Sequence, residues 1–198
     1  MNVAQTLLSM YATLFPTIFA GIINSLWCKS SLLSKLKVPI DFNKNFIDNK
    51  RIFGDNKTWK GLIGYIILNI VSQIIWGAIC DVVNINHINY FYVNHTNTLL
   101  YNLLLGFFLG VFYAFFELPN SFMKRRLGIE AGKPPKGLKK VFFIFIDQAD
   151  SVFGVCLVVA MFYKMSIGFY LTYVIIGAVT HILLNMLLFA LKIRKNMF

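Results

Sequence analysis

The sequence predicts an all-α integral membrane protein with about five transmembrane helices. Of its 198 residues 58% are apolar and only 14% are charged, which is far from the balance of an ordinary soluble domain. Apolar runs long enough to cross about 30 Å of hydrocarbon recur along the chain. Nearly all Lys and Arg residues lie in particular segments between these runs. We expect one polytopic domain over 1–198, because the chain shows no repeat and no separate soluble part.

Five spans are predicted, in order, at 2–27, 61–80, 98–118, 141–162 and 168–191. Pro16 and Gly21 interrupt the first run, as such residues often do in true spanning helices. The second and third runs are apolar over the full length of a span. The fourth is the least apolar, because it contains two Asp residues. The fifth is uniformly apolar apart from His181 and Asn185.

The distribution of charge predicts the topology. The segments 28–60 and 119–140 and the C-terminal tail hold all but one of the 19 Lys and Arg residues, and Lys164 is the exception. With five spans these three segments share one side of the membrane, so the positive-inside rule places them in the cytoplasm and the N-terminus outside. We therefore expect a multi-pass protein of the cell membrane whose site faces the cytoplasm. The net charge of +11 belongs to these segments and predicts no nucleic-acid partner.

Two carboxylates in the fourth span are the strongest functional signal. Asp147 and Asp150 are spaced i, i+3 and so share one helical face. An ionised Asp well inside a bilayer costs roughly 2.5–3.5 kcal/mol on insertion scales, so the pair needs a compensating partner or role. A bound divalent cation is one such partner, and cation plus Lys or Arg could hold a phosphate chain. Helix–helix contacts, proton relay or buried ion pairs are the structural alternatives.

The loop before this span carries a cationic cluster. We expect Pro119 to end the third span and Ser121 to cap a short interfacial helix. On that helix Lys124 and Arg125 would share a face with Ser121 and could contact phosphate. A topology signal is the alternative for this Lys-Arg-Arg triplet. Glu117, at the foot of the third span, is either a further metal or base ligand or a side chain that reaches the interface.

The first basic loop ends directly before the second span. Gly54-Asp55-Asn56 predicts a turn, after which Lys57, Thr58 and the free N–H groups of a helix start would suit phosphate oxygens. Contact with anionic lipid head groups is the alternative. Earlier in the loop, Pro39-Ile40-Asp41 predicts a turn with one exposed carboxylate.

Two further polar or small-residue patterns lie within the spans. His181 and Asn185 are spaced i, i+4, and we expect interhelical hydrogen bonds from them. Close glycine pairs suggest a homodimer contact, and the second pair also suits packing within the chain. These pairs are Gly61 with Gly64 and Gly106 with Gly110.

These residues together resemble the CDP-archaeol synthase family, short relatives of the phosphatidate cytidylyltransferases. The resemblance covers nearly the whole chain. Lys60 stands where the family often has Arg, and Gln148 where the longer relatives have a basic residue. The motifs that carry the resemblance are Pro39-x-Asp41, Arg51-x-x-Gly54-Asp55-x-Lys57-Thr58-Trp59-Lys60-Gly61, Ser121-Phe-x-Lys124-Arg125, Asp147-Gln-x-Asp150, and His181 with Asn185.

The resemblance implies a Mg²⁺-dependent reaction of CTP with a membrane lipid phosphate of the digeranylgeranylglycerol type, giving CDP-archaeol and pyrophosphate. It implies catalytic roles for Asp147, Asp150, Lys124 and Arg125, with Mg²⁺ on the two Asp residues. It further implies that the substrates contact Asp41, Asp55, Lys57, Thr58, Lys60, Ser121 and Arg126, with Glu117, His181 and Asn185 in support.

Three other functions remain open at the level of sequence. A non-catalytic membrane protein whose basic loops bind anionic lipid or a partner is one of them, but it leaves the Asp pair unexplained. A phosphatidate cytidylyltransferase would make CDP-diacylglycerol from the same site, because an apolar groove does not clearly exclude acyl tails. A small ion-coupled transporter would use Asp147, Asp150 and Glu117 as coupling residues. Transport folds usually show internal repeats and sites near the bilayer midplane, neither of which the sequence indicates.

Overall fold

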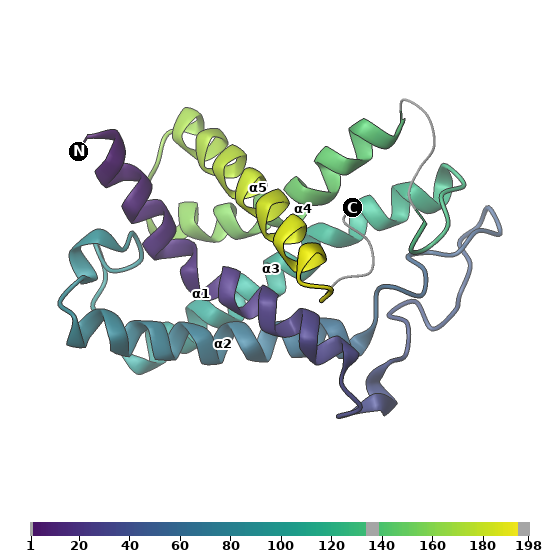
Figure 1. The fold of residues 1–198 in the computed structure, drawn as a ribbon, viewed down its shortest axis with the longest axis horizontal. Coiled ribbons are helices and arrows are strands. Elements are labelled where there is room, and N and C mark those ends of the chain that lie inside the picture. The colour runs from purple at the N-terminus through teal and green to yellow at the C-terminus, as the bar shows by residue number, and fades with distance from the viewer. Residues whose placement is uncertain (1, 134–138, 194–198) are drawn as a thin grey trace.

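A computed structural model of the chain describes residues 2–133 and 139–193 (Figure 1). Three basic residues of the predicted charge pattern, Lys136, Arg194 and Lys195, lie outside the described residues. Within the described part the architecture is all-α, and it contains five helices that are long and apolar enough to cross a membrane. The predicted fold class is therefore confirmed.

The helices are α1 (Val3–Lys29), α2 (Trp59–Val82), α3 (Leu99–Arg126), α4 (Lys139–Phe162) and α5 (Ile167–Ala190). Three long connections and one short one join them. Two 3₁₀ turns, η1 (Ser34–Leu36) and η2 (Asn86–Ile88), lie in the connections α1–α2 and α2–α3. Asn2, Thr58, Thr98 and Ser166 cap the N-termini of α1, α2, α3 and α5, because each side chain accepts a hydrogen bond from the first turn.

Helix α3 does not end at Pro119, so that expectation was wrong. The helix continues through Pro119 to Arg126, and Ser121 lies inside it, where its Oγ donates to the Glu117 carbonyl at 3.2 Å rather than capping a new helix. A proline is tolerated within a membrane helix when neighbouring groups satisfy the freed carbonyls. Gly128, at φ +74°, ends the helix in the left-handed conformation that favours glycine.

The helices pack in chain order, with α1 on α2, α2 on α3, α3 on α4 and α4 on α5. The basic connection 30–58, the segment after α3 and the end of α5 lie at one end of the bundle (Figure 1). Lys50 Nζ donates to the Arg126 carbonyl at 2.8 Å, and Lys29 contacts the Ile193 carbonyl. The described Lys and Arg residues thus gather at one end, Lys164 excepted. Their orientation toward the cytoplasm stays a prediction.

The opposite end of the bundle is closed by the connection between α2 and α3. The backbone N–H of Tyr90 donates to Thr13 Oγ1 at 3.0 Å, and the Tyr173 hydroxyl donates to the Met10 carbonyl at 2.8 Å. These contacts hold this connection and α5 against the first half of α1. The end that carries few charges is therefore tightly packed.

Small residues let α2 and α3 approach closely. A Cβ added at Gly106 would lie 2.5 Å from the Ile70 Cα atom, and one at Gly110 would lie 2.6 Å from the Ile66 Cα atom. The space beside Gly64 is occupied by Trp27, since an added Cβ would lie 2.3 Å from Trp27 Nε1. Gly64, Gly106 and Gly110 thus contribute to close packing within the chain. A homodimer stays a prediction.

Replacing Gly106 with Ala should reduce stability, because the added methyl meets the backbone of α2 rather than a movable side chain. Overpacking of this kind typically costs about 1–3 kcal/mol. Thermal unfolding of the purified protein in detergent measures the effect. Gly168→Ala is the matched control, since its Cβ would meet only Ser166 Oγ at 4.0 Å. Equal unfolding temperatures for the two variants would contradict this account of the α2–α3 contact.

Candidate active site

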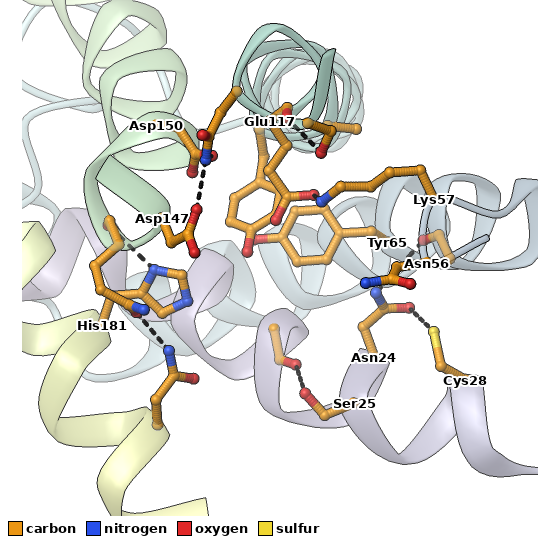
Figure 2. Close-up of a pocket in the computed structure, with 18 of the residues that line it drawn as sticks. Asn24, Ser25, Cys28, Asn56, Lys57, Tyr65, Glu117, Asp147, Asp150 and His181 are labelled. Atoms are coloured by element: carbon orange, nitrogen blue, oxygen red, sulfur yellow. Dashed lines mark hydrogen bonds and ion pairs between the residues drawn. The ribbon is translucent and has the colours of Figure 1, made fainter. Parts of the chain in front are cut away.

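A cavity of about 730 Å³ lies at the basic end of the bundle, with walls from all five helices. Figure 2 shows Asp147, Asp150 and His181 on one side of it and Lys57, Glu117 and Tyr65 on the other. This volume falls within the range of about 300–1,000 Å³ that is typical of small-molecule sites. The cavity is therefore the candidate active site.

The two carboxylates of α4 face this cavity together. Asn120 of α3 joins them, because its Nδ2 donates to Asp147 Oδ1 and to Asp150 Oδ2, each at 2.7 Å. Lys124 Nζ contacts the other oxygen of Asp147, forming an ion pair. The backbone N–H of Ser151 donates to Asp150 Oδ1 at 2.6 Å. The two Asp residues of α4 thus form one polar cluster with Asn120 and Lys124 of α3.

Asn120 is a site residue that the sequence analysis missed. It lies on the continuous part of α3 beyond Pro119, which had been predicted to end the helix. Once the helix continues, Glu117, Asn120, Ser121 and Lys124 are spaced i, i+3, i+4 and i+7 and form one polar stripe. That spacing is visible in the sequence. It was not used because Pro119 was expected to end the helix.

Lys57 reaches the cavity from the first connection and pairs with Glu117, with Nζ and Oε2 2.7 Å apart. Burial lowers the pKa of Lys57, but the Glu117 carboxylate, helped by Asp150 and Asp147, raises it above the ordinary value. Lys57 therefore stays protonated, and its positive charge lies beside three carboxylates. Glu117 is thus the ion-pair partner of Lys57, a role that the sequence analysis did not consider.

Thr58 and Lys60 follow Lys57 but differ in position. Thr58 lines the cavity as the N-cap of α2, and its Oγ1 accepts from the Gly61 N–H at 3.2 Å. Lys60 is almost fully buried elsewhere: its Nζ donates to the Ser30 carbonyl at 2.8 Å and lies 4.9 Å from the centre of the Trp27 ring. The structure thus brings Thr58 to the site and places Lys60 at the end of α1.

Asp41 was expected to be exposed, and that expectation was wrong. Its side chain is buried and accepts from Arg51 Nη2 at 2.7 Å and from the backbone N–H groups of Phe53 and Gly54, each at 2.9 Å. Burial raises the pKa of this carboxyl, but Arg51 and the backbone donors outweigh it and lower the pKa from 3.8 to about 2. Asp41 therefore holds the loop that carries Lys57, and it does not line the cavity.

Asp55 and Arg126 likewise lie outside the lining. Asp55 is mostly exposed and pairs with Arg51 at 2.7 Å. Arg126 pairs with Asp48 at 2.8 Å and lies 4.4 Å from the centre of the Phe122 ring, so it ties the first connection to α3. Ser121 and Arg125, by contrast, line the cavity.

The α5 wall carries the predicted polar patch. Asn185 Nδ2 donates to Gln148 Oε1 at 2.5 Å, and His181 Nδ1 lies 3.2 Å from the Gln148 carbonyl oxygen. The expected interhelical hydrogen bonds are thus confirmed, and they join α5 to α4 one residue away from Asp147. His181 and Asn185 both line the cavity.

Part of the cavity wall is apolar. Tyr65 and Tyr113 lie against each other with ring centres 4.0 Å apart, and both residues contribute to the wall. Apolar side chains from all five helices also line the cavity, and α1 and α5 supply five of them. These five are Leu14, Ile18, Ile22, Leu184 and Leu188.

The described residues contain no group of three or more His, Cys, Asp or Glu side chains positioned to hold a metal ion. They do offer two carboxylates close together, since the Asn120 NH₂ group donates to both Asp147 and Asp150. Oxygen ligands suit Mg²⁺, which commonly binds one or two carboxylates and completes its shell with water and substrate phosphates. The residues present therefore fit the expected ion.

This fold and this cavity define a polytopic membrane protein with a charged site set among its helices and an apolar wall next to it. A family model described as "CarS-like: CDP-archaeol synthase" matches residues 10–198. The chain therefore belongs to the CDP-archaeol synthase family.

Individual relatives carry the same name. The CDP-archaeol synthase of Sulfurisphaera tokodaii is 34% identical over 159 residues, which cover 79% of this chain and 80% of the relative. That of Thermofilum pendens is 28% identical over 198 residues, covering 98% of this chain and 80% of the relative. With that of Methanocaldococcus jannaschii, the match is 34% identical and spans only 58% of the relative's length.

A solved structure described as an intramembrane enzyme for archaeal membrane lipids biosynthesis has the same fold. Its TM-score is 0.58 at 18% sequence identity, and the match covers 89% of this chain and 92% of that one. At this identity the likeness shows the fold alone.

Asp41→Asn should loosen the first connection, because Arg51 and two backbone N–H groups lose a charged acceptor. Hydrogen bonds to charged groups contribute about 1.5–3 kcal/mol, so amide exchange over 41–54 should accelerate about tenfold or more. Hydrogen-exchange mass spectrometry measures this. Asp55→Asn is the matched control, because its carboxylate is exposed and pairs only at the surface.

The same carboxyl predicts a pH dependence. Its pKa in the folded protein, about 2, is lower than its ordinary value of 3.8. Its stabilising contribution is therefore complete above about pH 4 and is lost as the pH falls from about 4 to about 2. Exchange in this loop that stays constant through that window, after correction for intrinsic rates, would contradict the role given to Asp41.

Proposed function

We propose that the protein transfers the cytidylyl group of CTP to the phosphate of an ether-linked isoprenoid lipid, forming CDP-archaeol and pyrophosphate. One observation carries the proposal. A partly buried pair of carboxylates, joined by Asn120 and contacted by Lys124, lies in a cavity whose walls carry both charged and apolar side chains. Membership of the CDP-archaeol synthase family supports the same reaction and argues against the transporter alternative.

The proposed reaction needs no strong general acid or base from the protein. A phosphomonoester has its second pKa near 6, so the lipid phosphate is already mostly a dianion at neutral pH. One of its oxygens attacks the α-phosphorus of CTP and forms the new P–O bond. The bond from that phosphorus to the oxygen bridging to the β-phosphate breaks, and pyrophosphate leaves. Catalysis then depends on alignment and on neutralising charge.

Lys57 and Lys124 are placed to supply that neutralisation. Each is paired with a carboxylate of the cavity, Lys57 with Glu117 and Lys124 with Asp147. These lysines therefore lie in the cavity as charges that can turn to phosphate oxygens when a triphosphate enters. Arg125, which also lines the cavity, offers a forked donor suited to a phosphate group.

The cation requirement is part of the proposal. Asp147 and Asp150 would hold a Mg²⁺ ion, which when bound would neutralise charge on the phosphate oxygens. The protein's own contribution is to keep both carboxylates oriented, through Asn120 and the Ser151 N–H, and to keep the cations Lys57 and Lys124 within reach of the same space.

The lipid would approach from the apolar wall between α1 and α5. Ile18 and Ile22 of α1 and Leu184 and Leu188 of α5 line that part of the cavity. A lipid that lies there can keep its tails in the bilayer and place its phosphate beside Lys124. The same wall would accept acyl tails, so the assay below includes phosphatidate to test the CDP-diacylglycerol alternative.

The purified protein should release pyrophosphate and form a CDP-lipid from labelled CTP, Mg²⁺ and the ether-linked lipid phosphate. Asp147→Asn should abolish turnover while the protein inserts and purifies normally. Lys124→Ala should lower kcat by about 10²–10³-fold, the usual cost of losing one group that stabilises transition-state charge.

Lys35→Ala is the matched control, because Lys35 is an exposed lysine in the first basic connection, on η1 and away from the cavity lining. Its activity should stay within a few fold of the wild type. Equal losses in the Lys124 and Lys35 variants, or near-normal turnover of Asp147→Asn, would overturn the proposal. A CDP-diacylglycerol product at the higher kcat/KM would correct the substrate class instead.

A further inference from the structure

The side chain of Asn120 is more than a bridge between two carboxylates. It is 9% exposed, and its single NH₂ group makes both hydrogen bonds, to Asp147 and to Asp150 at 2.7 Å each. Its Oδ1, among the described residues, has no hydrogen-bond partner although it is buried. A buried acceptor without a partner is costly, and each such group in a folded protein calls for an explanation.

The amide can exchange its two ends without moving the backbone. An Asn side chain carries an acceptor and a donor of nearly the same shape, and a half-turn of its terminal torsion exchanges them. After such a turn Oδ1 would face the two carboxylates. Three oxygens facing one point repel one another unless a cation lies between them.

Three neighbouring polar side chains are engaged elsewhere. Glu117 pairs with Lys57, Ser121 Oγ donates to the Glu117 carbonyl, and the Gln148 side chain accepts from Asn185. Asn120 is the polar side chain that touches both Asp147 and Asp150 and has an uncommitted oxygen. This set of contacts singles it out.

We propose that Asn120, through Oδ1 after this half-turn, is a third oxygen ligand of a divalent cation held by Asp147 and Asp150. The inference rests on the proposed function for the identity of the cation as Mg²⁺. The position of Lys124 supports this inference. Lys124 lies on α3, as Asn120 does, and already provides positive charge to Asp147 of α4.

Cation binding can be measured without nucleotide or lipid, so it does not depend on turnover. Mn²⁺, an EPR-visible substitute for Mg²⁺, is titrated into the purified full-length protein, and free Mn²⁺ is read from its spectrum. Asn120→Ala should weaken binding about 10–100-fold, the range found when groups that organise a metal site are removed. Asn120→Asp, which keeps an oxygen at this position, should bind at least as tightly as wild type, and it serves if the alanine variant does not purify.

Asn102→Ala is the matched control. Asn102 lies on the same helix, is buried, and is hydrogen-bonded to Gln73, Tyr92 and Asn97 away from the cavity. It should lose stability without losing Mn²⁺ affinity. Equal affinities for Asn120→Ala and wild type, or equal losses in the Asn102 and Asn120 variants, would overturn the inference.

Direct ligation is tested by exchanging the oxygen for sulfur. Asn120→Cys in a Cys28→Ser background should lose Mn²⁺ affinity and gain Cd²⁺ affinity, with an ultraviolet thiolate-to-cadmium absorption band, because thiolates prefer soft cations. Asn102→Cys in the same background should show no such band. Absence of the band in the folded Asn120→Cys variant would contradict ligation. A wild-type protein that binds Mn²⁺ through Asn120 but makes no CDP-lipid would leave this inference standing and remove the proposed function.

Discussion

The placement of two carboxylates within an apolar helix is the constraint on which the rest of this structure depends. Asp147 and Asp150 can stay there because α3 supplies Asn120 and Lys124 to them. This requires α3 to continue as a helix beyond Pro119, so that its polar stripe reaches the level of the pair. The close glycine contacts of α3 with α2 then fix where that stripe lies relative to the first basic connection.

The first basic connection completes the site through its own internal scaffold. Asp41 gathers Arg51 and two backbone N–H groups, and Arg126 ties the same loop to the end of α3. Lys57 is thereby held where it pairs with Glu117 in the cavity wall. Some charged residues of the loop, such as Asp41 and Arg51, thus hold its conformation, whereas Lys57 faces the cavity. The sequence alone does not distinguish these two groups.

Much of the fold could be predicted from the sequence, because span length and charge segregation are properties of whole segments. The Asp pair could also be recognised, because ionised groups are rare within apolar runs. The role of Asn120 could not be predicted, because proline was expected to end the helix and an amide in a loop carries little signal. The burial of Asp41 and the position of Lys60 depend on contacts with residues distant in sequence, Arg51 for one and Ser30 for the other.

The central claim is that CTP and a cation bind in the cavity at the basic end of the bundle. Cys28 lines this cavity and is partly exposed, whereas Cys80 and Cys156 are buried, so the natural thiols already provide a reporter. The decisive measurement is the rate at which a water-soluble thiol reagent labels Cys28, read by mass spectrometry with and without saturating CTP and Mg²⁺. The account predicts strong protection by the pair, and little by CTP when Asp147→Asn is present. Equal labelling rates with and without CTP and Mg²⁺ would contradict it.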